Sequence, residues 1–120
     1  MPTALHGLRT VIYPAPDLEA VRAWWVRFLG FEPYFNRPFY VGFSVAGYEL
    51  GLLPTAAPED GALTYLGVDD VPAAVEAAVA GGASVHVPAA QVGGDIVTAT
   101  VRTPQGAIVG FIFNPHFGAH

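Results

Sequence analysis

Glu49 is the residue whose type and setting most suggest chemistry. It stands in FYVGFSVAGYELGLLP, residues 39–54, a stretch otherwise dominated by aromatic, aliphatic and small residues. An unpaired carboxylate in a dry hollow is costly or takes up a proton. We therefore expect Glu49 to meet water, a metal ion, a ligand or a cationic side chain, for which Arg9, Arg37 and Arg102 are candidates. The alternative is that Glu49 sits near a hairpin tip and faces solvent.

The histidines add few candidates for chemistry. They are His6, His86, His116 and His120, and only the last two are closely spaced. His86 alternates with two valines, which is typical of an ordinary strand residue. A divalent metal site made by Glu49, His86 and His116 is an alternative to a metal-free site. The sequence has no Ser-His-Asp spacing, and its lack of cysteine excludes thiol nucleophiles, disulfides and zinc–thiolate sites.

The composition narrows the class of protein. The 120 residues are 52% hydrophobic and 12% charged, with a net charge of −5. No Lys/Arg cluster exists to hold phosphates, so we expect no nucleic-acid partner. No apolar run reaches the length of a membrane span, and the start lacks a signal-peptide pattern, which favours a cytoplasmic protein. The low charge density favours a homodimer that covers apolar surface.

Two capped helices organise the chain. Asp17 precedes a predicted helix over 18–29 that ends at Gly30, and Asp70 precedes a second helix that ends at Gly81. Strand-forming stretches surround them, at 8–15, 31–38, 39–45, 48–53, 63–68, 83–88, 95–102 and 107–114. The chain thus repeats strand–helix–strand–strand–strand. We expect one α+β domain over 1–120, with module one at about 5–54, a linker at about 55–62 and module two at about 63–116.

The hairpin around Ala46-Gly47 sets the orientation of Glu49. A two-residue link with Gly predicts a tight turn in which Ser44 opposes Glu49. Alternation then places an apolar set against the helix, namely Phe39, Val41, Phe43, Val45, Tyr48, Leu50 and Leu52. The opposite face holds Glu49 above two glycines, Gly42 and Gly51, which leave room for a ligand. Each module's bare face is expected to border a shared hollow.

Aromatic residues are the other candidate ligand contacts. Tyr34, Phe35, Tyr40 and Tyr65 lie in or beside strands and suit a planar apolar ligand. The alternative is that they fill the hollow themselves or meet their counterparts across a dimer. In the first helix, helical spacing predicts a buried stripe of Leu18, Val21, Trp25 and Phe28. Trp24 lies off this stripe, which leaves it for the ligand groove or a dimer contact.

Three stretches resemble the vicinal oxygen chelate superfamily of glyoxalases, bleomycin-resistance proteins and extradiol dioxygenases. PDLEAVRAWWVRFLGF is similar to the family's first helix, GVDDVPAAVEAAVAGGASV to its second helix, and TPQGAIVGFIFNP to its terminal hairpin. The resemblance covers nearly the whole chain. It implies two paired βαβββ modules, a cup-shaped sheet and a dimer.

The resemblance also implies where a divalent metal ion would be held. The family's ligands are two His or Gln on the strands that open the modules and two Glu on the modules' last strands. These positions fall on Thr10, Leu63, Glu49 and Gly110, so one of four carries a ligand. A lone carboxylate is a poor metal site. The pattern therefore resembles the metal-free bleomycin-resistance branch.

Three hypotheses for function follow. The first is a binder of a small planar or apolar molecule without metal or other cofactor, in the cup or the dimer groove, with Trp24, Arg37, Tyr40, Glu49 and Tyr65 at the site. The second is a metal-dependent lyase, isomerase or dioxygenase, in which Glu49 and unconventional histidines hold a divalent ion. The third is a non-catalytic structural or regulatory module whose cup is self-filled. The sequence leaves catalysis open.

Overall fold

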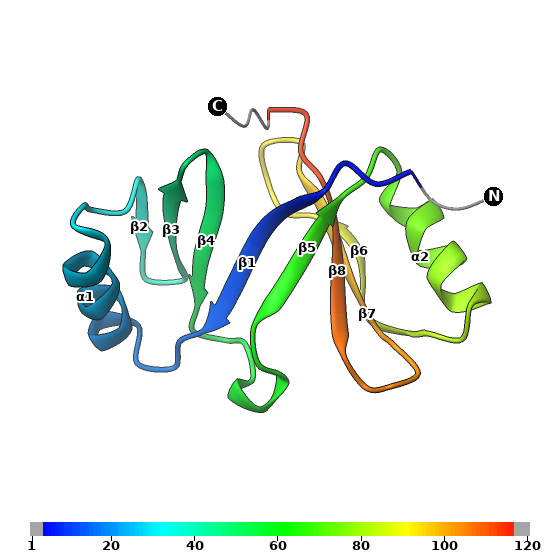
Figure 1. The fold of residues 1–120 in the computed structure, drawn as a ribbon, viewed down its shortest axis with the longest axis horizontal. Helices are drawn as coiled ribbons and strands as arrows, with labels where there is room; N and C mark the ends of the chain where they lie inside the picture. The colour runs from blue at the N-terminus through cyan, green and yellow to red at the C-terminus, as the bar shows by residue number, and fades with distance from the viewer. Residues whose placement is uncertain (1–3, 117–120) are drawn as a thin grey trace. The chain divides into compact units, whose positions relative to one another are not determined.

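The computed structural model describes residues 4–116, which form two units with the same order of elements. The first unit comprises residues 10–63, and the second comprises residues 4–9 and 64–116. In chain order the elements are β1 (Leu8–Pro14), α1 (Leu18–Leu29), β2 (Phe35–Arg37), β3 (Tyr40–Val45), β4 (Tyr48–Leu53), the short 3₁₀ helix η1 (Pro58–Asp60), β5 (Leu63–Gly67), α2 (Val71–Ala80), β6 (Ser84–Gln91), β7 (Val97–Arg102) and β8 (Ile108–Phe113) (Figure 1). The predicted α+β class with two βαβββ modules is confirmed.

Each unit builds its strands in the same pattern. In the first unit the strand order is β2-β3-β4-β1, and β1 runs parallel to β4. In the second unit the order is β6-β7-β8-β5, and β5 runs parallel to β8. The remaining neighbours are antiparallel, as short connections between consecutive strands require. The module boundaries, the cup and the homodimer stay predictions.

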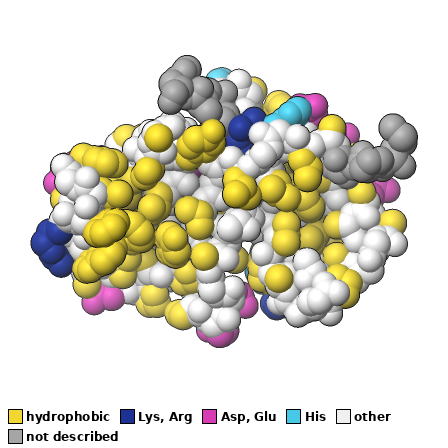
Figure 2. Space-filling model, in the orientation of Figure 1, with side chains coloured by type: hydrophobic (Ala, Val, Ile, Leu, Met, Phe, Trp, Pro, Cys, Tyr) yellow, Lys and Arg dark blue, Asp and Glu magenta, His cyan; other side chains and the backbone are white. Residues whose placement is uncertain are grey.

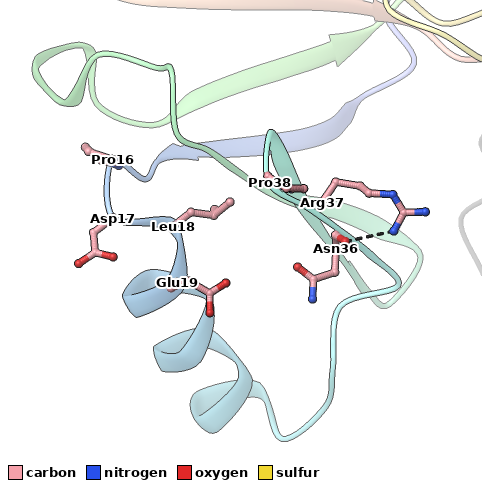
Figure 3. Close-up of a pocket in the computed structure, with 7 residues that line it drawn as sticks. All are labelled: Pro16, Asp17, Leu18, Glu19, Asn36, Arg37 and Pro38. Atoms are coloured by element: carbon pink, nitrogen blue, oxygen red, sulfur yellow. Dashed lines mark hydrogen bonds between the residues drawn. The ribbon is translucent and has the colours of Figure 1, made fainter.

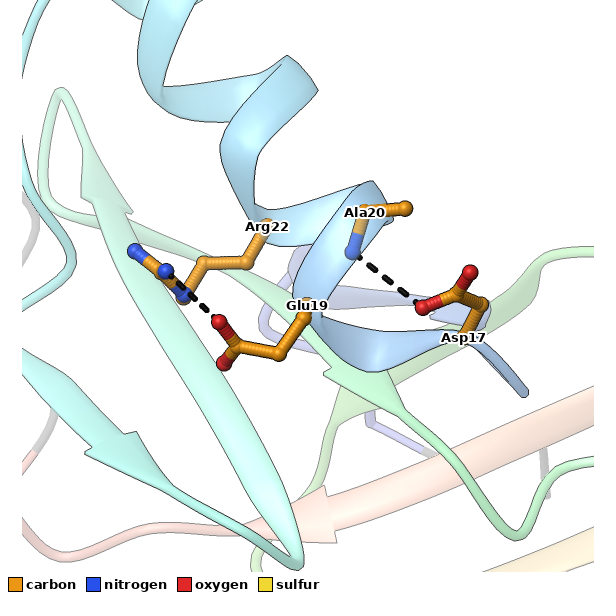
Figure 4. Close-up of polar contacts among 4 residues, drawn as sticks. All are labelled: Asp17, Glu19, Ala20 and Arg22. Atoms are coloured by element: carbon orange, nitrogen blue, oxygen red, sulfur yellow. Dashed lines mark hydrogen bonds and ion pairs between the residues drawn. The ribbon is translucent and has the colours of Figure 1, made fainter.

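Helix α1 begins and ends where its sequence predicts. The carboxylate of Asp17 accepts a hydrogen bond from the N–H of Ala20 at 3.3 Å, and Glu19 pairs with Arg22 at 3.1 Å on the next turn (Figure 4). Gly30 ends the helix in the left-handed conformation, with φ of 85°. Asp70 caps α2 in the same way, through the N–H of Ala73 at 3.0 Å. These side chains satisfy helix-terminal N–H groups that have no partner within the helix.

The β3–β4 hairpin has the predicted register. Val45 pairs with Tyr48, Ser44 with Glu49, and Gly42 with Gly51. The two turn residues, Ala46 and Gly47, have φ values of 53° and 88°. Positive φ at both central residues is typical of a type I′ turn, whose twist matches that of the two strands it connects. Glu49 therefore lies on the sheet face predicted for it.

The core of the first unit lies between α1 and one face of its strands. Val41, Phe43 and Leu52 are fully buried there, and Leu50 joins them. Trp25 packs on this cluster and stacks on Tyr13, with ring centroids 5.5 Å apart. Helix α1 therefore covers the sheet face opposite to Glu49.

Three predicted core residues, Phe28, Phe39 and Tyr48, are instead exposed. Tyr48 is 44% exposed because it stands beside the two-residue turn at the end of the β3–β4 hairpin. Phe28 is 68% exposed because it lies about 80° from the centre of the buried stripe, where Leu29 takes the inward position. Phe39 is 63% exposed because it belongs to the turn that precedes β3. Figure 2 shows hydrophobic side chains gathered on the surface over α1.

The second unit has its own core. Val71 and Ala74 of α2 pack with Val101 of β7 and Phe111 of β8. Val71 and Val101 are nearly fully buried. No helix within residues 4–116 is long and apolar enough to cross a membrane.

Candidate ligand-binding site around Glu49

Glu49 stands on β4 between two neighbouring strands. It is opposite Ser44 of β3 and next to Thr10 of β1. Its side chain is half-buried, so the carboxylate is neither in the core nor fully in solvent. This placement supports the predicted face and excludes burial of the charge under α1.

Two tyrosine hydroxyls hold the carboxylate of Glu49. The hydroxyl of Tyr34 donates to Oε1 at 2.6 Å, and the hydroxyl of Tyr40 donates to Oε2 at 2.6 Å. Bonds of this length from O–H to a carboxylate are charge-assisted and among the stronger ones in proteins. The expected arginine partners are thus replaced by neutral donors. Arg37 donates instead to the carbonyl of Asn36, and Arg102 to that of Gly106.

Glycines make room for this arrangement. A Cβ on Gly42 would lie 2.7 Å from Oε2 of Glu49, and a Cβ on Gly51 would lie 2.6 Å from Cζ of Tyr40. Real Cβ atoms do not approach other atoms this closely. The predicted free space above the two glycines is therefore taken up in part by the Tyr40 ring and the Glu49 carboxylate.

Burial of its hydroxyl raises the pKa of Tyr34, and the hydrogen bond to Glu49 and the charge of that carboxylate raise it further. The phenol therefore stays protonated and keeps donating at neutral pH. Both tyrosine protons are committed to Glu49, so the phenol oxygens can only accept from a ligand. The carboxylate keeps unused lone pairs as well. The site offers acceptors and one negative charge.

Further aromatic and basic side chains share the Glu49 face. Phe35 pairs with Gly42 and Arg37 pairs with Tyr40, which puts both side chains on this side of the sheet. The Phe35 ring is 6.1 Å from that of Tyr40, and the Arg37 guanidinium lies 5.4 Å from the centre of the Phe35 ring. The structure thus brings Arg37, Tyr40 and Glu49 to one face of the first unit.

Arg37 also borders a shallow pocket of about 390 Å³ beside the start of α1 (Figure 3). Asp17 and Glu19 lie on the other side of this pocket. The guanidinium of Arg37 turns away from both carboxylates, toward the Asn36 carbonyl at 3.2 Å. Asp17 instead caps α1, and Glu19 pairs with Arg22 of the same helix.

The structure does not bring Trp24 to the Glu49 face. Trp24 is 50% exposed and stacks on Phe28, with ring centroids 5.1 Å apart. Both residues are on α1, which packs on the opposite side of the sheet. Trp24 therefore belongs to an outer aromatic surface of the helix.

Tyr65 of β5 is buried in the second unit, with only 8% of its surface exposed. Its ring covers Gly110, where a Cβ would lie 2.6 Å from Cε2 of the tyrosine. Burial raises the pKa of the Tyr65 hydroxyl. Tyr65 thus occupies the space above Gly110 in its own unit.

A sequence profile of the Glyoxalase/Bleomycin resistance protein/Dioxygenase superfamily matches residues 7–111. The chain belongs to this superfamily. The profile covers the first module, including β4 with Glu49, and the second module as far as residue 111 in β8. No curated protein sequence matches the chain.

Solved structures share the superfamily fold with this chain at low sequence identity. A superfamily member from Vibrio splendidus 12B01 has a TM-score of 0.64 and 22% identity over 88% of this chain and 97% of its own. Methylmalonyl-CoA epimerase in complex with methylmalonyl-CoA and NH4+ has a TM-score of 0.70 and 16% identity over 98% of this chain and 100% of its own. The Mn(II)-bound glyoxalase from Novosphingobium aromaticivorans has a TM-score of 0.70 and 17% identity over 98% of this chain and 42% of its own.

The residues at the superfamily's metal-ligand positions do not fit a divalent ion. Beside Glu49 stands Thr10, and both oxygens of the Glu49 carboxylate already accept tyrosine protons. Within residues 4–116, no three His, Asp or Glu side chains gather to hold an ion. A divalent cation prefers several anionic or neutral donors with free lone pairs, and this set supplies one shared carboxylate.

The strand register corrects one of the equivalences between the modules. The N–H of Ala15 bonds the carbonyl of Leu53, and the N–H of Val68 bonds that of Ile112. Counting back along each last strand makes Ile108 the counterpart of Glu49, and Gly110 the counterpart of Gly51. Glu49 and Gly110, which the sequence assigned to the same ligand position of the two modules, are therefore not equivalent, and neither glycine nor isoleucine can bind a metal ion.

The histidines of the alternative metal site have other partners. His86 Nδ1 lies 2.8 Å from the hydroxyl of Thr100, which is buried. His116 Nε2 lies 3.8 Å from a carboxylate oxygen of Asp95. His120 is outside the described residues. His86 and His116 thus both have polar partners other than Glu49.

Sequence reasoning missed the role of Tyr34. It placed Tyr34 among the aromatic ligand candidates, whereas the structure makes it a hydrogen-bond donor to Glu49. The contact depends on the pairing of Phe35 with Gly42, which puts the residue before β2 within reach of the Glu49 face and which no sequence pattern specifies.

Proposed function

We propose that the protein is a metal-free small-molecule binder of the bleomycin-resistance type. Its ligand is a small planar molecule that carries an amine, amide or amidine, and the donor group of this ligand binds Glu49. One observation carries the proposal: both oxygens of the lone carboxylate accept tyrosine protons at 2.6 Å, which creates a surface of acceptors. Membership of the superfamily supports the fold of the site.

The chemistry of the ligand follows from the groups that face it. Glu49 and the two phenol oxygens accept hydrogen bonds, so a donor-rich and preferably cationic group complements them. Phe35 and the tyrosine rings offer aromatic surface for a planar body. A ligand carboxylate beside Glu49 would be repelled by the negative charge of that residue.

Benzamidine and benzoate test this proposal as an isosteric pair of opposite charge. In calorimetric titration at neutral pH we expect saturable binding of benzamidine, weakened at least about 10-fold by Glu49→Gln because a charged hydrogen bond contributes about 1.5–3 kcal/mol. Glu76→Gln, an exposed change on α2, is the matched control and should leave affinity unchanged. Equal benzamidine affinity in wild type and Glu49→Gln would refute the proposal, as would stoichiometric retention of Ni²⁺, Zn²⁺ or Fe²⁺ after dialysis that Glu49→Ala abolishes.

A structural or regulatory module is the second candidate. The ring of Tyr65 over Gly110 favours it, because this part of the second unit is filled by its own side chain. Absence of any saturable benzamidine binding, together with unchanged melting temperature across a panel of planar cations, would support this candidate over the binder.

Self-association and a cytoplasmic location remain parts of the proposal. The exposed Trp24 and Phe28 stack offers apolar area that a second copy of the chain could cover. Light scattering should give the mass of a dimer, and Trp24→Ser should shift the protein toward the monomer. A monomer at high concentration would contradict this expectation.

A further inference from the structure

Ser44 lies beside Glu49 on the neighbouring strand of the same sheet. The turn between β3 and β4 has two residues, so Val45 and Tyr48 are the hydrogen-bonded pair that closes it. Ser44 and Glu49 are the next pair and therefore a non-hydrogen-bonded one, in which Cα atoms are about 4.5 Å apart and side chains are closest. Because Phe43 is buried in the core, alternation along β3 puts the Ser44 side chain on the Glu49 face.

The carboxylate of Glu49 leans over β3, the strand that carries Ser44. A Cβ on Gly42 of β3 would lie 2.7 Å from Oε2 of Glu49. Gly42 and Ser44 are two residues apart, which is about 6–7 Å along a strand. This is more than one hydrogen bond of about 2.8 Å can span. The carboxylate and the Ser44 side chain thus lie along β3 at a separation that a ligand with two polar groups can bridge.

The hydroxyl of Ser44 is accessible to such a ligand. Ser44 is exposed, and its hydroxyl makes no hydrogen bond to another group within residues 4–116. The protons of Tyr34 and Tyr40, by contrast, both go to Glu49. A serine hydroxyl has one proton to donate and two lone pairs. Ser44 therefore adds a donor to a face whose other polar groups are acceptors.

We propose that Ser44 determines the specificity of this face for an amine with an oxygen on the adjacent carbon, a role that rests on the proposed function of the Glu49 face. The amine of the ligand donates to Glu49, and Ser44 donates to the ligand oxygen. The aromatic body meets the rings of Phe35 and Tyr40, which lie around Gly42. The ligand class thus narrows from planar cations in general to aromatic 1,2-amino alcohols and their carbonyl counterparts.

Thr10 offers a matched control on the other side of Glu49. It pairs with Glu49 from β1, and no hydrogen bond of its hydroxyl to another group occurs in the part of the chain that the structure describes. The carboxylate leans away from Thr10, toward Gly42 of β3, and the neighbouring strand is itself about 4.8 Å away. Thr10→Val keeps the shape of the side chain and removes the hydroxyl.

Two amines that differ by one hydroxyl group test the role of Ser44. 2-Amino-2-phenylethanol carries its oxygen on the carbon next to the amine-bearing carbon, and 1-phenylethylamine of matching configuration has hydrogen in its place. Both are cations at neutral pH. In calorimetric titrations of the full chain we expect the amino alcohol to bind about 3–10-fold more tightly, which is the contribution of a neutral hydrogen bond.

Ser44→Ala should remove this preference and leave the affinity for 1-phenylethylamine unchanged, which also shows that the variant keeps its fold. Ser44→Thr retains a hydroxyl and should retain the preference, as should Thr10→Val. Glu49→Gln should weaken the binding of both amines at least about 10-fold, because it removes the charged acceptor.

The outcomes separate the role of Ser44 from the function on which it rests. Binding of both amines that depends on Glu49 but shows no preference would overturn the role of Ser44 and leave the proposed function standing. A preference that survives Ser44→Ala, or that Thr10→Val removes, would do the same. Failure of both amines to bind would overturn the proposed function and the role of Ser44 together.

Discussion

The hydroxyl of Tyr34 lies 2.6 Å from the carboxylate of Glu49, although the two residues come from a loop and from β4. The backbone places them together, because the N–H of Tyr34 bonds the carbonyl of Gly42 at 3.1 Å and thereby docks the loop on β3. Tyr40 approaches the same carboxylate from β3 itself. The loop that carries Tyr34 and the strand β3 that carries Tyr40 thus both hold the Glu49 carboxylate in place.

Removing the Tyr40 hydroxyl should weaken both stability and binding. Tyr40→Phe keeps the ring over Gly51 but leaves Oε2 of Glu49 without this donor. We expect a loss of about 1–2 kcal/mol in the free energy of unfolding, measured by urea denaturation. Tyr34→Phe is the comparison, and its loss should be smaller because Tyr34 is 64% exposed. A larger effect at Tyr34 would contradict this ranking.

A methyl group at Gly51 should displace the Tyr40 ring. Gly51→Ala creates an overlap with the Tyr40 ring, so the ring must move and its hydroxyl leaves the hydrogen bond to Glu49. We expect about 1–3 kcal/mol of destabilisation and a benzamidine affinity at least about 10-fold lower. Gly81→Ala is the control, because its Cβ would be in ordinary contact with the Ala78 carbonyl at 3.4 Å and its φ is −86°. Similar losses for both variants would show that the Tyr40 contact is not the cause.

Stability should fall at alkaline pH through Tyr34. The pKa of its hydroxyl is raised in the folded protein, so the folded state retains a proton that the unfolded state loses above about pH 10. The stabilisation is fully present below about pH 10 and is lost as pH rises from there toward the folded pKa. Tyr65 acts in the same direction. Tyr34→Phe should flatten this decline, measured by denaturation between pH 9 and 12 with phenolate absorbance as the readout of ionisation; an unchanged slope would refute the assignment.

A substitution in the turn between β3 and β4 should make the protein more stable. Ala46 has φ of 53°, a left-handed conformation that is unfavourable for alanine and accepted more readily by asparagine. Ala46→Asn creates the Asn-Gly pair preferred in this turn and should raise the free energy of unfolding by about 0.5–1 kcal/mol. Thermal or urea unfolding measures the gain. Destabilisation would mean that the alanine methyl group has a packing role.

Truncating Tyr65 should open a cavity over Gly110. Tyr65 is 8% exposed, so Tyr65→Ala removes buried ring surface and should cost about 3–5 kcal/mol. Tyr65→Phe keeps the ring and should cost far less. Added phenol should partly restore the melting temperature of Tyr65→Ala but not of wild type. If phenol does not raise the melting temperature of Tyr65→Ala, the Tyr65 ring does not fill a cavity that matches its shape.

Much of the fold could be predicted because its signals are local. Asp17 and Gly30 mark the ends of α1 through cap chemistry, and Ala46-Gly47 sets the register of β3 with β4 through turn geometry. The 53-residue spacing of Asp17 and Asp70 predicted the repeated order of elements. The burial of Phe28 was predicted wrongly, because helical spacing does not tell which of two neighbouring positions lies nearer the centre of a contact.

The sequence alone determined that Glu49 faces away from the helix-covered core, because alternation along a strand and the length of a turn decide which side a residue occupies. It also determined that the superfamily's metal-ligand positions carry Thr10 and Leu63, since this is a matter of residue identity. Only the tertiary structure decided that Tyr34 and Tyr40 donate to Glu49 and that Tyr65 covers Gly110. Hydrogen bonds and ring contacts of this kind depend on ångström-scale docking of one element on another, which no local pattern specifies.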